Sequence, residues 1–242
     1  AENITLFGIY GGNGGVLTII GKDTANQITI DGKKDVYTQN THSLIHVYGG
    51  GILNISENTV VTNNVVASGH SPGAIWVVGD GQLYITGGSI TSNDALGSYN
   101  SGGAISTEGK VVMTSGLISE NTASGSAGAI EINAMDGASF DFSGGEISDN
   151  TASHGGGVSV TGESVTYDSN GQITAIHHSY FNMTGGHICN NTAEFAGGVS
   201  SFGIFTMSGG EITNNTATHQ YGIGGIEVSG GHFIMTGGSI HH

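Results

Sequence analysis

The sequence predicts an all-β protein, a right-handed parallel β-helix (solenoid) of about eight coils with three short strands in each coil. Three observations predict this fold. One phrase, an apolar residue followed by a Gly pair, an Ile and an Asn three residues later, recurs along the chain. Apolar residues alternate within each copy of the phrase. The composition, with 45 Gly and one Pro in 242 residues, favours short strands and tight turns.

The recurring phrase has a period typical of stacked repeats. Its copies are YITGGSITSNDA, VMTSGLISENTA, DFSGGEISDNTA, NMTGGHICNNTA, TMSGGEITNNTA and the shorter IMTGGSI. A looser copy, ILNISENTVVTNNVV, precedes them. The aligned Asn residues, spaced by 30, 28, 29, 41 and 24 residues, are Asn63, Asn93, Asn121, Asn150, Asn191 and Asn215.

Each copy supplies three inward-facing segments. Two apolar positions two residues apart, such as Leu83 and Ile85, point to the same face of a first strand. An Ile after the Gly pair, such as Ile90, starts a second segment, and a pair such as Ala104–Ile105 lies in a third. Stacking the copies at about 4.8 Å places like residues on like residues.

The Gly and Asn positions of the phrase suit the corners of a coil. A Gly pair fits a corner that needs positive φ or a close approach of two backbones. An inward-turned Asn can bond both to the backbone and to the Asn of the next coil, so the six Asn residues predict a structural ladder.

We interpret residues 1–240 as a single β-helix domain. Residues 1–50 are less regular and predict the first coils or a cap. The 41-residue spacing before Asn191 indicates an inserted loop or hairpin at residues 161–178. The repeat stops after Ile240, so we expect a segment of a longer protein, with residues 241–242 as a purification-tag remnant.

Charge excludes some partners. Nineteen acidic residues against four Lys give a net charge of −15. Phosphate backbones and anionic lipid surfaces both require basic groups, so we expect no nucleic-acid partner and no insertion into a membrane. The charge suits an extracellular, cation-attracting surface. The single cysteine, Cys189, excludes a framework of intrachain disulfides.

The residues Ser-Gly-Gly-Ala-Ile at 101–105, followed by Ile118-Ser-Glu-Asn121, resemble the repeats of chlamydial polymorphic membrane proteins. The phrase is still more similar to adhesin-like β-helix proteins of gut bacteria and methanogens. This resemblance covers about residues 50–240 and departs from the chlamydial pattern in having Ile where that motif has Phe. It implies a secreted or wall-attached surface protein with an adhesive or stalk role.

A carbohydrate-active enzyme is the alternative, because the pectin-lyase-like fold also hosts polysaccharide lyases and glycoside hydrolases. Lyases of that class use basic residues, whereas this chain has no Arg and only Lys110 beyond residue 34. The NTD, DD, GHG and RIK elements of the polygalacturonase-like hydrolases are not present in the sequence. We therefore name no catalytic residue.

Candidate site residues fall in three groups. The insertion offers Tyr167, Asp168, His177 and His178 as a binding site, although an insertion without a role is the simpler interpretation. Glu120 and Asp149 share an outward position on neighbouring coils and are weak candidates for Ca²⁺, with a solvated acidic face as the simpler interpretation. Trp76, Tyr99 and Tyr221 are candidates for stacking on sugar rings.

The sequence thus predicts a monomeric, non-catalytic segment of an extracellular adhesin or stalk. We expect it to need no cofactor, with Ca²⁺ as an open alternative. Its expected partner is a glycan or a protein of a host or cell surface.

Overall fold

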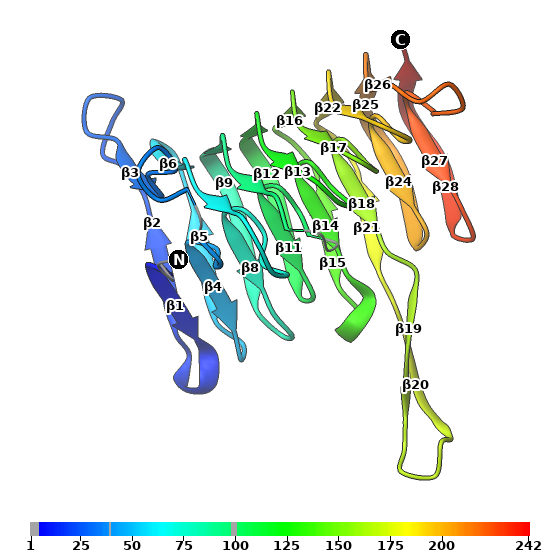
Figure 1. The fold of residues 1–242 in the computed structure, drawn as a ribbon, viewed down its shortest axis with the longest axis horizontal. Coiled ribbons are helices and arrows are strands. Elements are labelled where there is room, and N and C mark those ends of the chain that lie inside the picture. The colour runs from blue at the N-terminus through cyan, green and yellow to red at the C-terminus, as the bar shows by residue number, and fades with distance from the viewer. Residues whose placement is uncertain (1–4, 39, 98–100) are drawn as a thin grey trace.

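The computed structural model describes residues 5–38, 40–97 and 101–242 and shows an all-β protein built mainly of parallel sheets. Successive repeats lie side by side along the long axis of the molecule, in chain order from one end to the other (Figure 1). Each strand therefore pairs with its counterpart in the preceding and the following repeat. This arrangement is compatible with a solenoid.

The first sheet has eight short strands, and all its neighbours are parallel. Its middle strands pair in register, so that Ile105 lies between Ile75 and Ile130. In order, the strands are β1 (Phe7–Tyr10), β4 (Ile45–Tyr48), β8 (Ile75–Val77), β11 (Ile105–Thr107), β14 (Ile130–Ile132), β18 (Val158–Val160), β24 (Val199–Ser201) and β27 (Ile226–Val228).

The second sheet has twelve strands and bends at the Gly pairs. Four of its strands run through the bend as single ten-residue strands, where the alternation predicts two short ones. Its strands are β2 (Val16–Ile19), β3 (Ile28–Asp31), β5 (Ile52–Ile55), β6 (Thr59–Thr62), β9 (Gln82–Thr91), β12 (Lys110–Ser119), β15 (Ser139–Phe142), β16 (Glu146–Ser148), β21 (Tyr180–Met183), β22 (His187–Cys189), β25 (Ile204–Thr213) and β28 (His232–His241).

A third sheet, which the sequence does not predict, has six strands of two residues each. It follows the recurring Asn, and its Ala residues are buried at Ala95, Ala123 and Ala152. Its strands are β7 (Val65–Val66), β10 (Asp94–Ala95), β13 (Thr122–Ala123), β17 (Thr151–Ala152), β23 (Thr192–Ala193) and β26 (Thr216–Ala217).

The insertion is an antiparallel hairpin of β19 (Glu163–Tyr167) and β20 (Ile173–His178), which projects from the stack in Figure 1. Two 3₁₀ turns complete the described elements, η1 (Gly11–Asn13) and η2 (Ala134–Asp136). Residues before position 50 stack like the later repeats, because β1 pairs with β4 and β2 with β5. No described helix is long and apolar enough to cross a membrane.

Stacked identical side chains fill the interior. Phe140, Phe181 and Phe205 are fully buried, and the ring centroids of successive pairs are 5.2 and 4.5 Å apart. Ile90, Ile118 and the equivalent residues of later repeats form a second buried column. The alternation of apolar residues predicts both columns, because parallel strands that pair in register place the equivalent residues of successive repeats next to one another.

The Gly pairs turn the corner between the two halves of the bent sheet. The second Gly of each pair has a positive φ, for example 100° at Gly145. A Cβ at Gly145 would lie 2.7 Å from the carbonyl oxygen of Gly116 in the preceding repeat. Both the backbone conformation and the approach of the next repeat therefore require Gly here.

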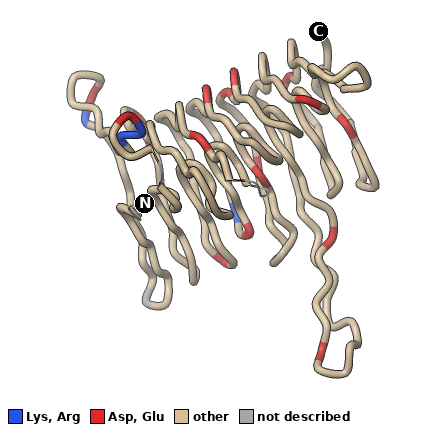
Figure 2. The backbone as a smooth tube through the Cα atoms, in the orientation of Figure 1, with Lys and Arg blue, Asp and Glu red and all other residues tan. Residues whose placement is uncertain are grey.

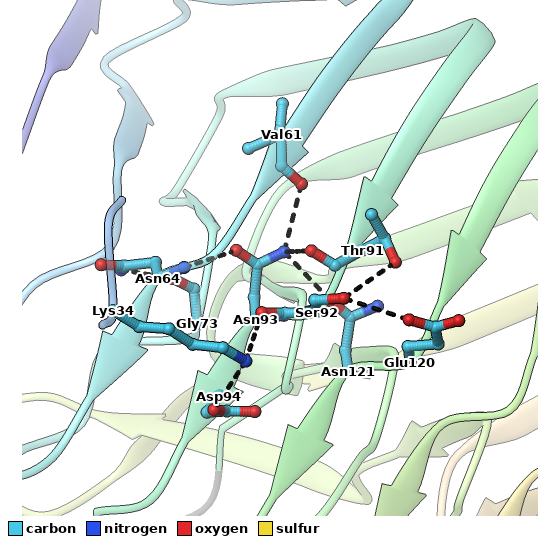
Figure 3. A network of polar contacts seen from close by, with 10 residues as sticks. All are labelled: Lys34, Val61, Asn64, Gly73, Thr91, Ser92, Asn93, Asp94, Glu120 and Asn121. Atoms are coloured by element: carbon cyan, nitrogen blue, oxygen red, sulfur yellow. Dashed lines mark hydrogen bonds and ion pairs between the residues drawn. The ribbon is translucent and has the colours of Figure 1, made fainter. Parts of the chain in front are cut away.

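A buried row of Asn side chains links the repeats at the next corner (Figure 3). The backbone N–H of Asn121 donates to the Oδ1 of Asn150, and its Nδ2 donates to the same oxygen, both at 3.0 Å. The Asn121 Nδ2 also donates to the carbonyl oxygens of Ile90 and Ser119. The same pattern continues through the row, whose members are Asn64, Asn93, Asn121, Asn150, Asn191 and Asn215.

The first member of the row corrects the prediction of Asn63. Asn64 is fully buried, and its backbone N–H donates to the Oδ1 of Asn93 at 3.2 Å. Asn63 instead has a φ of 57°, like Ser92 and Glu120, which precede the next two members of the row. The register explains the difference: Val61 pairs with Ile90, so the residue three positions later is Asn64.

Loss of one central amide should destabilise the protein strongly. Asn121→Ala leaves the buried carbonyl oxygens of Ile90 and Ser119 without this donor. We expect the free energy of unfolding to fall by at least about 3 kcal/mol, because each buried unsatisfied group costs roughly 1–3 kcal/mol. Urea unfolding followed by circular dichroism measures the loss.

Asn182→Ala is the matched control, because the Asn182 amide also bonds across strands, to Asp141 at 2.9 Å, but is only partly buried. We expect it to cost less than about 1 kcal/mol. Equal losses in the two variants would contradict the importance of the buried row.

Candidate functional site

The middle residues of the eight-stranded sheet form an outward row. The first and third residues of strands such as β11 and β14 point into the core, so the middle residue faces outward. Strand pairing places these residues side by side, each one strand from the next. In order, they are His46, Trp76, Ser106, Glu131, Ser159, Ser200 and Glu227.

Glu131 is the unusual member of this row, because its carboxyl group is buried although it faces outward. The side chain is only 1% exposed. The Ser106 hydroxyl donates to its Oε2 at 2.9 Å, and the backbone N–H of Gly102 donates to that hydroxyl oxygen at 3.0 Å. The other oxygen, Oε1, has no hydrogen-bond partner. A buried acceptor without a partner is costly in a protein and indicates a functional role or a missing ligand.

A cavity of about 230 Å³ lies over this part of the row. Ser106 is small and sits between Trp76 and Glu131, so it leaves a hollow between two large side chains. Glu108 and Asn133, which directly follow β11 and β14, extend the wall. His70 from the loop before β8 and Met135 from η2 complete the lining.

Burial controls the ionisation of the groups in this region. Loss of solvent raises the pKa of Glu131 to about 6; the Ser106 hydrogen bond opposes this shift and the Glu108 charge adds to it. Burial also lowers the pKa of His46, and the charge of His42 lowers it further. The imidazole of His46 packs edge-on against Trp76 with ring centroids 5.5 Å apart, which fixes the indole.

A second cavity of about 380 Å³ lies further along the same face. Ser159 from the outward row, Thr161 and Phe202 line it together with His154. The two cavities therefore occupy one continuous face of the stack.

A row of aromatic rings lies on the loops that lead into the eight-stranded sheet. We call it the aromatic row; its members are His154, Phe195, His219 and Tyr221. The ring centroids of His154 and Phe195, and of Phe195 and His219, are 4.9 and 4.8 Å apart, which is close to the spacing of the repeats. Tyr221 lies in the same loop as His219, with ring centroids 5.6 Å apart. Tyr221, at the end of the row, is 79% exposed.

The structure does not bring the four predicted residues of the insertion together. Tyr167 and Asp168 lie at the tip of the hairpin, where Asp168 accepts hydrogen bonds from the backbone N–H groups of Asn170 and Gln172. These bonds lower the pKa of Asp168. His177 and His178 lie at the base, where the Nδ1 of His178 is 3.3 Å from a carboxylate oxygen of Glu163. The hairpin pairing separates the two ends, so these residues do not form one site.

The predicted calcium candidates occupy a turn. Glu120 and Asp149 are both exposed and have φ values of 57° and 58°, each immediately before a member of the Asn row. The Ser92 hydroxyl donates to Glu120 at 3.2 Å. Neither belongs to a cluster of three or more Asp, Glu, His or Cys side chains able to hold a metal, since the described part of the chain contains none.

The cysteine and the three aromatic residues named from the sequence lie in different places. Burial and the charges of Glu146 and Asp149 raise the pKa of the Cys189 thiol, which disfavours a reactive thiolate. Trp76 is half-buried against His46 and lines the first cavity. Tyr221 belongs to the aromatic row, and Tyr99 lies outside the described residues.

Sequence reasoning missed Glu131 as a site residue. The signal was the segment Ile130-Glu131-Ile132, in which a carboxyl group occupies the outward position of the third strand, where the adjacent copies on both sides have Ser106 and Ser159. The sequence alone could not show that the loops over this strand exclude water from it. Comparison of the chain with protein-family models, with characterised proteins and with solved structures finds no match.

The buried carboxyl group of Glu131 should make stability depend on pH. Its folded-state pKa of about 6 lies above the ordinary 4.5, so the folded protein is favoured below pH 4.5 and loses that advantage as pH rises through 6. Glu131→Gln removes this titration. The stability of the variant relative to the wild type should therefore rise by about 2 kcal/mol between pH 4 and pH 7.5.

Urea unfolding at both pH values measures this difference. Glu227→Gln, on the same outward row but half-exposed, is the control and should show little change. A constant difference between Glu131→Gln and wild type across the pH range would contradict the burial of an ionisable carboxyl group here.

Proposed function

We propose that this chain is a right-handed parallel β-helix of about eight coils that forms a non-catalytic, glycan-binding segment of an extracellular adhesin or stalk. Strand–crossover–strand connections in parallel sheets are right-handed in about 98% of cases, which supports the handedness. The in-register stacking of strands from β1 to β27 supports the solenoid. In this proposal the segment is secreted or attached to a cell wall.

The aromatic row is the observation that carries glycan binding. The rings of His154, Phe195 and His219 stack from repeat to repeat and present a line of ring edges, and Tyr221 adds a largely exposed ring at the end of the row. Such side chains bury apolar area against a flat partner while their polar groups keep hydrogen bonds. A linear polysaccharide can follow a row of this kind along several repeats.

The surface charge supports the choice of partner. Acidic residues are spread along the whole stack, whereas three of the four Lys residues lie in the first repeats (Figure 2). Lys110 pairs with Asp141 at 3.6 Å. We propose a neutral or cationic glycan, or a host-surface protein carrying one, and no nucleic acid. The segment acts as a monomer without a cofactor.

A carbohydrate-active enzyme is the second candidate, and one observation favours it. Glu108 and Glu131 line a single cavity beside Trp76, and the pKa of Glu131 is raised to about 6. A carboxyl group with a raised pKa can act as a general acid beside a second carboxylate.

A glycan array followed by titration of the bound glycans tests the proposal. Phe195→Ala or Tyr221→Ala should weaken binding about tenfold, because loss of one stacking contact removes roughly 1–1.5 kcal/mol. Tyr167→Ala, at the tip of the hairpin, is the control and should bind normally. Loss of binding in Tyr167→Ala alone would place recognition on the hairpin instead.

Incubation of the same polysaccharides with the protein separates the two candidates. The adhesin proposal predicts neither new reducing ends nor unsaturated uronates. Product formation that Glu131→Gln abolishes would establish the enzyme and overturn the proposal.

A further inference from the structure

We infer that the cavity beside Trp76, Ser106 and Glu131 binds the ammonium group of a small organic cation, the free amine of an amino sugar. The choice of a sugar rests on the proposed function. The choice of an ammonium group rests on the cavity itself.

The unpaired oxygen of Glu131 requires a donor. Its Oε1 is buried without a hydrogen-bond partner, while Oε2 is held by Ser106 at 2.9 Å. The carboxylate is therefore fixed in place with one acceptor free. An N–H group entering the cavity would satisfy that acceptor with a charge-assisted hydrogen bond.

The charge of the lining favours a cation over a neutral donor. Glu108 lines the same cavity, and its charge acts on Glu131. A cation placed between Glu108 and Glu131 would offset the cost of two close carboxylates, one of which is buried.

The remaining walls favour an organic cation over a metal ion. The indole of Trp76 lines the cavity, and a cation over an aromatic ring is attracted by the ring quadrupole. Ca²⁺ takes six to eight oxygen ligands, whereas part of this lining is Trp76 and Met135. The volume of about 230 Å³ is small for a ligand pocket and matches a group no larger than a single sugar unit.

Met135 offers the route of entry. It lies on the short turn η2, is 54% exposed and has an unbranched, flexible side chain. The base of the hairpin lies beside the same turn. A sugar whose amine reaches Glu131 would displace Met135 and project toward the hairpin.

Trp76 is the only Trp in the chain, so its fluorescence reports on this cavity alone. Glucosamine, glucose, N-acetylglucosamine, methylammonium and CaCl₂ are titrated at pH 7.0, with calorimetry as a second readout. We expect glucosamine and methylammonium to bind, because both carry a charged N–H donor, and the two uncharged sugars to bind at least about tenfold more weakly, because they lack the charge. Equal binding of glucose, or saturation by CaCl₂ alone, would overturn the inference.

The pH profile adds a signature of Glu131. His70, Glu108 and Glu131 line the cavity, and His46 lies behind Trp76. Methylammonium keeps its charge and its N–H donors between pH 5.0 and pH 7.0, so calorimetry with this probe follows the protein groups only. We expect binding to weaken about tenfold between pH 7.0 and pH 5.0, as the Glu131 carboxylate gains its proton. Unchanged binding at pH 5.0 would count against Glu131 as the partner.

Variants complete the test. Glu131→Gln should lose at least about tenfold in affinity for glucosamine, since the charge is removed with little change of shape. Glu227→Gln, on the same row, should bind normally, and thermal unfolding by circular dichroism checks that both variants fold. Normal binding by folded Glu131→Gln would refute the inference.

The outcomes distinguish this inference from the proposed function. Glycans bound equally by wild type and Glu131→Gln would leave the adhesin proposal standing without this site. Glucosamine bound through Glu131, with no glycan retained on the array, would support the site and refute the adhesin proposal.

Discussion

The row of buried Asn amides is the interaction on which the other features of the stack depend. From Asn121 onward, each Oδ1 accepts from the backbone N–H and the Nδ2 of the Asn in the preceding repeat, and each Nδ2 in the row also donates to backbone carbonyl oxygens. Such a row requires a fixed offset between repeats, because its donors and acceptors are buried. Once that offset is set, Phe lies next to Phe and Ile next to Ile in successive repeats, and the parallel strands pair in register.

The stacking therefore restricts which side chains can occupy the interior, whereas the side chains of the outer face can vary from repeat to repeat. The first residue of each strand in the eight-stranded sheet is Ile or Val from Ile75 to Ile226, while the outward positions change from Trp to Ser to Glu. Burial raises the pKa of the Glu131 carboxyl group to about 6, so we expect its ionisation at neutral pH to cost stability. Such a perturbed group is typical of residues retained for binding or catalysis.

Much of the fold could be predicted from the sequence, because the spacing of the repeated apolar and Gly residues indicates where strands and corners lie. The alternation of Phe140 and Phe142 and the Gly pairs report strand faces and corners directly. The register at Asn63 and Asn64 could not be resolved by inspection, since two adjacent Asn residues fit the phrase and only the pairing of Val61 with Ile90 separates them. The two-residue strands of the third sheet were too short to leave a periodic signal.

The candidate site was harder to predict, for a physical reason. Burial of Glu131 depends on loops and a 3₁₀ turn that are irregular in sequence, and an outward carboxyl group in a strand is normally solvated. The hairpin residues Tyr167 and His178 were near in sequence and polar, but antiparallel pairing holds them at opposite ends. Proximity along the chain was therefore a poor guide to proximity in space.

Native-state hydrogen exchange tests most directly whether the Asn row holds the stack together. Backbone amides of Asn93, Asn121 and Asn150 donate within the row, whereas the hairpin is exposed. The account predicts that the row amides exchange only by global unfolding and are among the slowest in the chain, while hairpin amides exchange by local opening. Row amides that exchange as fast as those of the hairpin would contradict it.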